Sequence, residues 1–278
     1  MIFRARGFEW DLDKRALVMG VVNITPDSFS DGGDCLDPER AALRAKDFEA
    51  EGADILDLGA ESSRPGAPSI SAREELERLL PALRLVIRRT KLPVSIDTTK
   101  AAVAEKALQE GASIVNDVSG LKADPGLGGV VTRFGAGLVI MHRRGDAETM
   151  QTLSHYENLI SEVSQEIKES IDIALKAGIS YDQIVLDPGI GFAKTKDQNL
   201  SLIKHLDSFK RFQRPLLIGV SRKSFIGEIT RRQPKDRFFG TAASVALSIV
   251  QGANIVRVHD VQEMKDVVQV TEAILNAE

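Results

Sequence analysis

The stretch PVSIDTTKAAVAEKALQEGASIVND, residues 93–117, decides the fold class. Its two short apolar runs, residues 93–96 and 113–115, are rich in Val and Ile and are typical of buried strands. The longer segment between them predicts a helix, so the unit reads strand, helix, strand. Because near-continuous apolar strands suit a sheet that is covered on both faces, we expect the two strands to be parallel.

The same alternation runs from one end of the chain to the other. Eight apolar runs predict strands: residues 16–22, 53–58, 93–96, 113–115, 137–141, 183–186, 215–220 and 254–258. A helical stretch follows each run, and eight such units predict a (β/α)8 barrel. We expect one domain over residues 1–278, with residues 1–15 as an N-terminal extension or hairpin. An open doubly wound sheet is the alternative, but it usually carries a glycine-rich dinucleotide turn, which this sequence lacks.

Two Asp-Pro pairs predict helix starts. In both Asp37-Pro38 and Asp124-Pro125 the aspartate suits the N-cap, and proline suits the first helical position. The alanine-rich stretch 238–252 predicts a helix that packs closely against the sheet.

Composition narrows the class of protein. The chain is 43% hydrophobic and 27% charged, as in ordinary globular proteins. With 36 Lys and Arg against 40 Asp and Glu, a general nucleic-acid-binding role is disfavoured. The single cysteine, Cys35, allows no intrachain disulfide and fits a reducing compartment. No signal peptide is recognisable and no apolar run approaches the about 18 residues of a membrane span, so we expect a soluble cytoplasmic protein.

The active site of such a barrel lies at the C-terminal ends of its strands. All eight predicted strands are followed by, or end in, a polar residue: Asn23, Asp57, Asp97, Asn116, His142, Asp187, Ser221 and Arg257. Turn formation explains Asp and Asn singly but not an arginine, so a functional ring is favoured. Four of the following segments are longer than the usual about 2–6 residues and predict lids or binding loops: residues 23–36, 59–70, 142–155 and 221–237.

Two groups of these residues predict chemistry. Lys223, Arg257 and His259 follow the seventh and eighth strands, where barrels of this type commonly bind phosphate. The nearby Arg231, Arg232, Lys235 and Arg237 are interpreted as solvated surface charge.

The second group is Asp97, Asn116 and Asp187. A carboxylate presents two acceptors that match the adjacent N–H donors of a 2-amino-4-oxo-pyrimidine ring. A metal site is a weaker interpretation because no histidine joins the three. A carboxylate pair for glycoside hydrolysis stays open, and residue type alone does not decide.

Longer motifs resemble the dihydropteroate synthases, in the order of that family. The strings are MGVVNITPDSFSDGG (19–33), LGAESSRPGA (58–67), SIDTTK (95–100), VND (115–117), DPGIGFAK (187–194), GVSRKSFIG (219–227) and VRVHDV (256–261). They cover nearly the whole chain, and NITPDSFSDGG together with SRKSFIG is very specific. The resemblance implies a barrel transferase of folate biosynthesis, which is a sulfonamide target. Such an enzyme condenses 7,8-dihydropterin-6-ylmethyl diphosphate with 4-aminobenzoate to give 7,8-dihydropteroate and pyrophosphate, and it requires Mg²⁺.

The resemblance also implies a set of site residues. Those expected to bind the pterin diphosphate are Ser63, Asp97, Asn116, Asp187, Lys223, Arg257 and His259. Asp97, Lys223 and Arg257 are the expected catalytic residues among them. Those expected near the aminobenzoate are Phe29, Arg64, Pro65, Phe192 and Ser224. Asn23 is expected to hold Mg²⁺ together with the diphosphate, since its amide oxygen is a hard ligand.

The implied reaction is a substitution at the methylene carbon and needs no protein nucleophile. We therefore expect a structural role for His142 and none for Cys35. Three positions depart from the family pattern: Ser63 replaces a common Thr, Ala193 a common Gly, and Arg143 a common Met.

Two other functions compete with this one. A methyltetrahydrofolate:corrinoid methyltransferase would share the barrel and the pterin pocket, and a non-catalytic pterin-binding paralogue would bind without turnover. Neither explains the retained motifs as well. The family also implies a homodimer through the later helices, which suits the apolar face of residues 238–252.

Overall fold

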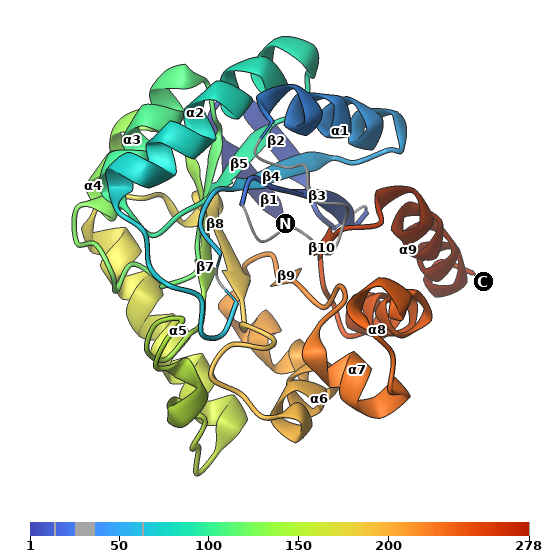
Figure 1. Ribbon diagram of the computed structural model, residues 1–278. Coiled ribbons are helices and arrows are strands. Elements are labelled where there is room, and N and C mark those ends of the chain that lie inside the picture. The colour runs from blue at the N-terminus through green and yellow to red at the C-terminus, as the bar shows by residue number, and fades with distance from the viewer. Residues whose placement is uncertain (14, 26–36, 63, 278) are drawn as a thin grey trace.

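A computed structural model describes residues 1–13, 15–25, 37–62 and 64–277 (Figure 1). Eight of its strands lie in one sheet: β3 (Leu17–Asn23), β4 (Ile55–Gly59), β5 (Val94–Asp97), β6 (Ile114–Asp117), β7 (Gly137–Met141), β8 (Ile184–Asp187), β9 (Leu217–Ile218) and β10 (Ile255–Val258). The α-helices are α1 (Pro38–Ala50), α2 (Ala72–Arg89), α3 (Ala101–Glu110), α4 (Leu127–Phe134), α5 (Leu159–Lys176), α6 (Lys196–Lys204), α7 (Ser224–Thr230), α8 (Phe238–Val250) and α9 (Val261–Leu275).

The sheet closes into a parallel barrel inside a ring of helices (Figure 1). Neighbouring strands follow the order β8-β7-β6-β5-β4-β3-β10-β9, and each pair is parallel. A parallel bridge between Leu186 and Leu216 joins β8 to the segment that enters β9. This bridge closes the ring, so the (β/α)8 prediction is confirmed and the open doubly wound sheet is excluded. The β9 strand is shorter than predicted at both ends. Pro215 has no N–H to donate at its start, and beyond its end the Val220 carbonyl accepts from the Lys223 N–H in a turn.

The segment after β9 differs from the long loop that we predicted. It contains α7 and a 3-10 turn, Pro234–Asp236, before α8 begins at Phe238. The α7 helix ends where Arg231 takes a left-handed conformation, with φ 58°. In the described ranges no helix has the length and apolarity needed to span a bilayer.

The two predicted Asp-Pro helix starts have different outcomes. Asp37 is the N-cap of α1, and its side chain accepts a hydrogen bond from the backbone N–H of Glu39. The prediction for Asp124 is wrong by about two residues, because α4 begins at Leu127. The Asp124 carboxylate accepts instead from the N–H groups of Gly126 and Ala101, so it joins two helix starts.

A hairpin covers the N-terminal end of the barrel. It consists of β1 (Ile2–Ala5) and β2 (Phe8–Asp11), which are antiparallel. Phe3 stacks on Trp10 with ring centres 5.3 Å apart, and it packs against the first residues of several barrel strands. Gly137 begins β7 beneath it, where a Cβ would lie 2.7 Å from the Phe3 ring. The hairpin fills this end, so polar groups gather at the opposite one.

Candidate active site

Asp57, Asp97 and Arg257 meet at the C-terminal mouth of the barrel, although they come from β4, β5 and β10. The Arg257 Nε donates to Asp57 Oδ2 at 2.6 Å, and its Nη2 donates to Asp97 Oδ2 at 3.0 Å. Asn116 Nδ2 donates to the same Asp57 oxygen at 3.1 Å. Asp57 is fully buried, and its Oδ1 has no hydrogen-bond partner within the described part of the chain. Sequence reasoning placed Asp57 in the ring of strand ends but gave it no role.

The carboxyl groups of the mouth are harder to ionise than usual. Burial raises the pKa of Asp97 to about 7, although the Arg257 guanidinium opposes the shift. Burial also raises the pKa of Asp187 to about 6, against the Gly189 N–H that donates to it at 2.7 Å. A ligand that donates hydrogen bonds to these oxygens would stabilise their charged forms.

Lys223 lies between two segments of the mouth. It is the N-cap residue of α7, and its Nζ lies 4.3 Å from the centre of the Phe192 ring. Gly191 passes close by, where a Cβ would lie 3.2 Å from the Lys223 side chain. Burial, with Arg257 nearby, lowers the pKa of Lys223 to about 8. Its cation is therefore held against an aromatic face.

The turn that carries Lys223 is held by charged groups on both sides. Arg222 has a left-handed φ of 58°, and its guanidinium forms a 2.6 Å ion pair with Asp260. Arg237 donates to the carbonyl oxygens of Arg222 and Lys223 at 2.9 and 3.2 Å. The interpretation of Arg237 as solvated charge is therefore wrong. Gly227 makes room for the Arg237 guanidinium, since a Cβ at this position would clash with it.

His259 follows β10 on the same side of the mouth. Its Nδ1 lies 3.0 Å from Ser221 Oγ, and its backbone N–H also donates to that oxygen. Burial first, and then Arg222 and Arg257, lower the pKa of His259 to about 3. The ring is therefore neutral at pH 7, and it can offer an anion an N–H group rather than a positive charge.

Asn23 ends β3 and is half-buried beside Gly59, its register partner on β4. Its amide oxygen is the type of ligand that Mg²⁺ accepts. No group of three His, Cys, Asp or Glu side chains suited to a metal occurs among the residues that the structure describes.

Two long loops meet above the mouth. The loop after β4 crosses in front of β7 and β8 in Figure 1, and the Gly66 N–H donates to the Ala147 carbonyl of the loop after β7 at 2.7 Å. Arg64 and Pro65 on this loop are exposed, as is Ser224 at the start of α7. Phe29, Ser63 and Cys35 lie outside the described residues.

The other departures from the family pattern lie in the wall beneath these loops. Arg143 is half-buried, and its Nε has no hydrogen-bond partner in the described ranges. Burial lowers the pKa of Arg143, and the charges of Asp117, Asp146 and Asp97 oppose the shift. Ala193 is fully buried and has φ 49°, a conformation that glycine adopts at less cost.

Comparison with known proteins agrees with this geometry. Residues 19–259 match the family model described as pterin binding enzyme. The dihydropteroate synthase of Synechocystis is 46% identical, over 96% of this chain and 92% of that protein. The Yersinia pestis dihydropteroate synthase, solved with a sulfonamide drug complex, has a TM-score of 0.95 at 37% identity, and all of both chains is covered.

A third relative carries a ligand. The Thermus thermophilus dihydropteroate synthase, solved with 4-aminobenzoate, has a TM-score of 0.89 at 39% identity, over 99% of this chain and 100% of that one. The match extends over the barrel, the polar mouth and both long loops. The chain therefore belongs to the pterin-binding enzymes and, within them, to the dihydropteroate synthases.

Proposed function

We propose that this chain condenses 7,8-dihydropterin-6-ylmethyl diphosphate with 4-aminobenzoate, releasing 7,8-dihydropteroate and pyrophosphate. The observation that carries the proposal is the convergence of acceptors and cations on one mouth. Asp97 and Asp187 come from β5 and β8, and Arg257 and Lys223 supply positive charge beside them. This set suits a molecule that is a hydrogen-bond donor at one end and an anion at the other.

In this proposal the carboxylates bind the pterin ring. Asp97 and Asp187 accept from its amino and ring N–H groups, and Asn116 adds an amide to the same pocket. Asp57 acts on these groups indirectly, because it holds both Arg257 and the Asn116 amide. Lys223 lies against Phe192 and would be within reach of the polar edge of the pterin ring.

The diphosphate lies over the cationic side of the mouth. Arg257 offers a fork of N–H donors, and neutral His259 offers one more. Asn23 would hold Mg²⁺ together with the diphosphate, and the bound ion would neutralise the charge that develops on departing pyrophosphate. Arg257 and His259 lower the same barrier by donating to those oxygens as the C–O bond breaks.

The arylamine then attacks the methylene carbon. Arg64, Pro65, Phe192 and Ser224 would surround the aminobenzoate, and Phe29 completes this proposed set, while Ser63 belongs to the set proposed for the pterin diphosphate. The lone pair of its amino nitrogen forms the new C–N bond in place of the C–O bond to pyrophosphate, and the amine loses its proton afterwards. Closure of the loops 24–36 and 59–70 would keep water from the electrophilic carbon.

The first test measures pyrophosphate and dihydropteroate together, with Mg²⁺, with and without 4-aminobenzoate. We expect pyrophosphate release to require the arylamine and to equal the product formed. Pterin binding without release would contradict the synthase proposal and indicate the non-catalytic paralogue. Two variants test the site. Asp187→Ala should abolish pterin binding by calorimetry, and Arg257→Ala should reduce turnover more than it raises the KM for aminobenzoate.

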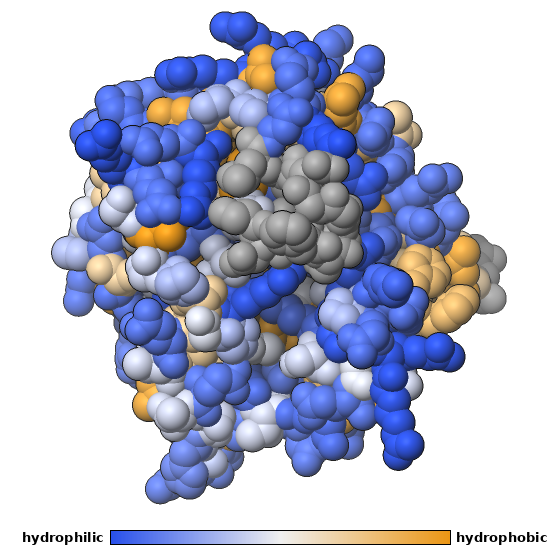
Figure 2. Space-filling model, viewed as in Figure 1, coloured by the Kyte–Doolittle hydropathy of each residue, from blue (hydrophilic) through white to orange (hydrophobic). Residues whose placement is uncertain are grey.

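A homodimer is part of the proposal. Exposed apolar side chains line one side of the late helices: Ile229 on α7, Phe239, Leu247 and Val250 on α8, and Val270 and Ile274 on α9. Figure 2 shows hydrophobic residues gathered on this side of the molecule. A patch of this kind is typical of a protein–protein contact, and a second copy of the chain would cover it. Sulfonamide binding at the aminobenzoate site and a cytoplasmic location complete the proposed assignment.

A further inference from the structure

A buried lysine lies behind the mouth, outside the set of residues that touch substrate in the proposed function. Lys194 is 8% exposed, and its Nζ lies 3.0 Å from His142 Nδ1 and 2.9 Å from the Phe192 carbonyl oxygen. The Glu166 carboxylate only accepts, so His142 Nε2 carries the proton and its Nδ1 accepts from Lys194. His142 Nε2 then donates to Glu166 Oε2 at 3.1 Å.

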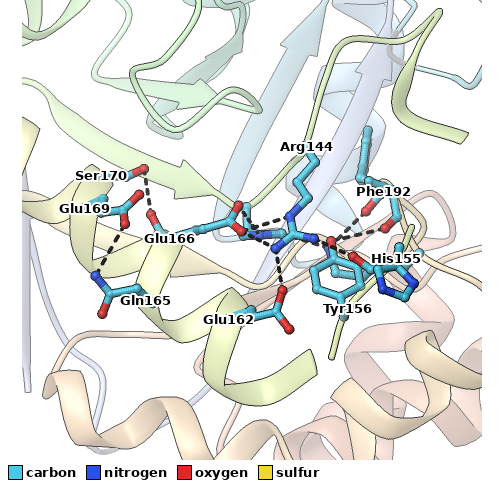
Figure 3. A network of polar contacts seen from close by, with 12 residues as sticks. Arg144, His155, Tyr156, Glu162, Gln165, Glu166, Glu169, Ser170 and Phe192 are labelled. Atoms are coloured by element: carbon cyan, nitrogen blue, oxygen red, sulfur yellow. Dashed lines mark hydrogen bonds and ion pairs between the residues drawn. The ribbon is translucent and has the colours of Figure 1, made fainter. Parts of the chain in front are cut away.

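The far end of this chain of contacts is held from α5. Arg144 donates to Glu166 through its Nε at 2.8 Å and to Glu162 through its Nη2 at 2.8 Å. Figure 3 shows Arg144 between these carboxylates and Tyr156, whose ring lies 4.0 Å from the guanidinium carbon. The buried amino group of Lys194 is therefore connected through His142 to a carboxylate that is itself paired with Arg144.

At the other end of this network, Lys194 and its neighbours contact the loop 188–194. Lys194 holds the Phe192 carbonyl, and the Tyr156 hydroxyl donates to the next carbonyl, that of Ala193, at 3.2 Å. Gly189 in the same loop lies so close to His142 that a Cβ would be 2.0 Å from its carbonyl oxygen. Two carbonyls of the loop and one of its glycines thus contact one buried network.

This loop presents the Phe192 ring to Lys223 and supplies the Gly189 N–H to Asp187. A shift of the loop would therefore move two groups of the mouth together. We propose that Lys194 is a positioning residue, which holds the loop 188–194 through His142 and Glu166 so that Phe192, Lys223 and Asp187 keep their places for the pterin diphosphate. This inference rests on the function proposed for the mouth.

The test compares Lys194→Met with Lys196→Met, an exposed lysine two residues along the chain. Calorimetry with the pterin diphosphate is expected to show at least about a ten-fold weaker affinity for Lys194→Met, equivalent to ~1.4 kcal/mol. The Lys196→Met control should bind like the wild type. Tyr156→Phe removes only the hydroxyl that donates to the Ala193 carbonyl, so the variant should fold. It should also weaken pterin diphosphate binding, by a smaller factor.

Hydrogen exchange of the loop gives a readout that needs no ligand. Amides of residues 189–193 should exchange about ten-fold faster or more in Lys194→Met, while those of 94–110 across the barrel should not change. Unchanged loop exchange would overturn the positioning role, whatever the affinity. Faster loop exchange with unchanged pterin diphosphate affinity in both Lys194→Met and Tyr156→Phe would also overturn it. If the wild type binds no pterin diphosphate, the proposed function fails, and loop exchange alone decides whether Lys194 holds the loop.

Discussion

Arg257 and Asn116 both donate to one oxygen of Asp57, which is fully buried in the middle of β4. A buried carboxylate of this kind is tolerated because a guanidinium faces it at hydrogen-bond distance. The residue therefore sets the direction in which Arg257 points, and through it the direction of Asp97. In the proposed reaction Asp57 would act by positioning Arg257.

We expect Asp57→Asn to fold less stably and to turn over slowly. Removal of the charge leaves Arg257 with Asp97 alone, and loss of one partner of a buried pair typically costs about 3–5 kcal/mol of unfolding free energy. Urea unfolding and steady-state kinetics measure the two effects. Asp182→Asn is the matched control, since that aspartate pairs with Arg4 at the opposite, exposed end of the barrel. Normal turnover in Asp57→Asn would show that Arg257 keeps its position without this partner.

Residue-level prediction from sequence was strongest where a motif met a strand end. Asp97, Asn116, Asp187 and Arg257 lie at the mouth because parallel strands place their carboxyl ends together. The pairing of Arg257 with Asp57 was not predictable. Asp57 and Asp97 lie on adjacent strands, and the sequence gives no reason to prefer either as the partner of Arg257. The role of Arg237 was missed for a related reason, because its partners are backbone carbonyls that carry no residue-type signal.

At the scale of elements, the loop after β4 is held at its base by three charged residues, of which one is fully buried. Lys100, the N-cap of α3, lies 2.7 Å from both Glu61 and fully buried Glu75. The other Glu61 oxygen accepts from the backbone N–H of Ile70 at 2.9 Å. One ammonium thus joins the two ends of a loop to the strand that presents Asp97.

We expect Lys100→Met to release this loop, because two carboxylates would then face one another without a cation. The KM for 4-aminobenzoate should rise by about ten-fold or more, the loss of ~1.4 kcal/mol of binding free energy. Pterin diphosphate affinity should change much less, since its proposed ligands lie on the strands. Lys106→Met, an exposed change on the same helix, is the control. Equal losses of both affinities would indicate general damage to the mouth instead.

Element boundaries followed from local chemistry in some places and from tertiary contacts in others. The start of α1 was predictable because Asp37 and Pro38 act within three residues of each other. The α7 helix was not, because its short sequence has no cap signal, and Arg222, Asp260 and Arg237 from distant parts of the chain hold the turn before it. Local rules therefore failed where residues far apart in the sequence determine the backbone.

For the whole molecule, the alternation of strands and helices was sufficient to predict the barrel. Closure itself rests on one bridge, Leu186 with Leu216, which no pattern in either segment announces. The choice between a closed and an open sheet came from the number of units and from the lack of a dinucleotide turn. Charge and composition excluded classes of function, but only the motifs distinguished among pterin, metal and glycoside chemistry.

The apolar side of α8 and α9 leads to a prediction about assembly. We expect the wild type to sediment as a dimer, and Leu247→Asp to shift it to the monomer, because a buried charge without a partner opposes association. Leu247 is 58% exposed in the isolated chain. Leu175→Asp on α5, 43% exposed, is the matched control and should remain dimeric. A monomeric wild type at micromolar concentration would contradict the proposed dimer.

The double pairing of Arg257 also bears on selectivity in a cell. Without substrate, its guanidinium is shared by Asp57 and Asp97, so a stray inorganic phosphate finds this arginine already engaged. With the roles proposed above, a pterin diphosphate can occupy Asp97 with its ring and recruit Arg257 with its tail in the same event. The mouth therefore selects a molecule that carries both a hydrogen-bond-donating ring and an anionic tail over one that carries only one of them. After the C–O bond to pyrophosphate breaks, Asp57 and Asp97 again compete for Arg257. This competition favours the release of pyrophosphate.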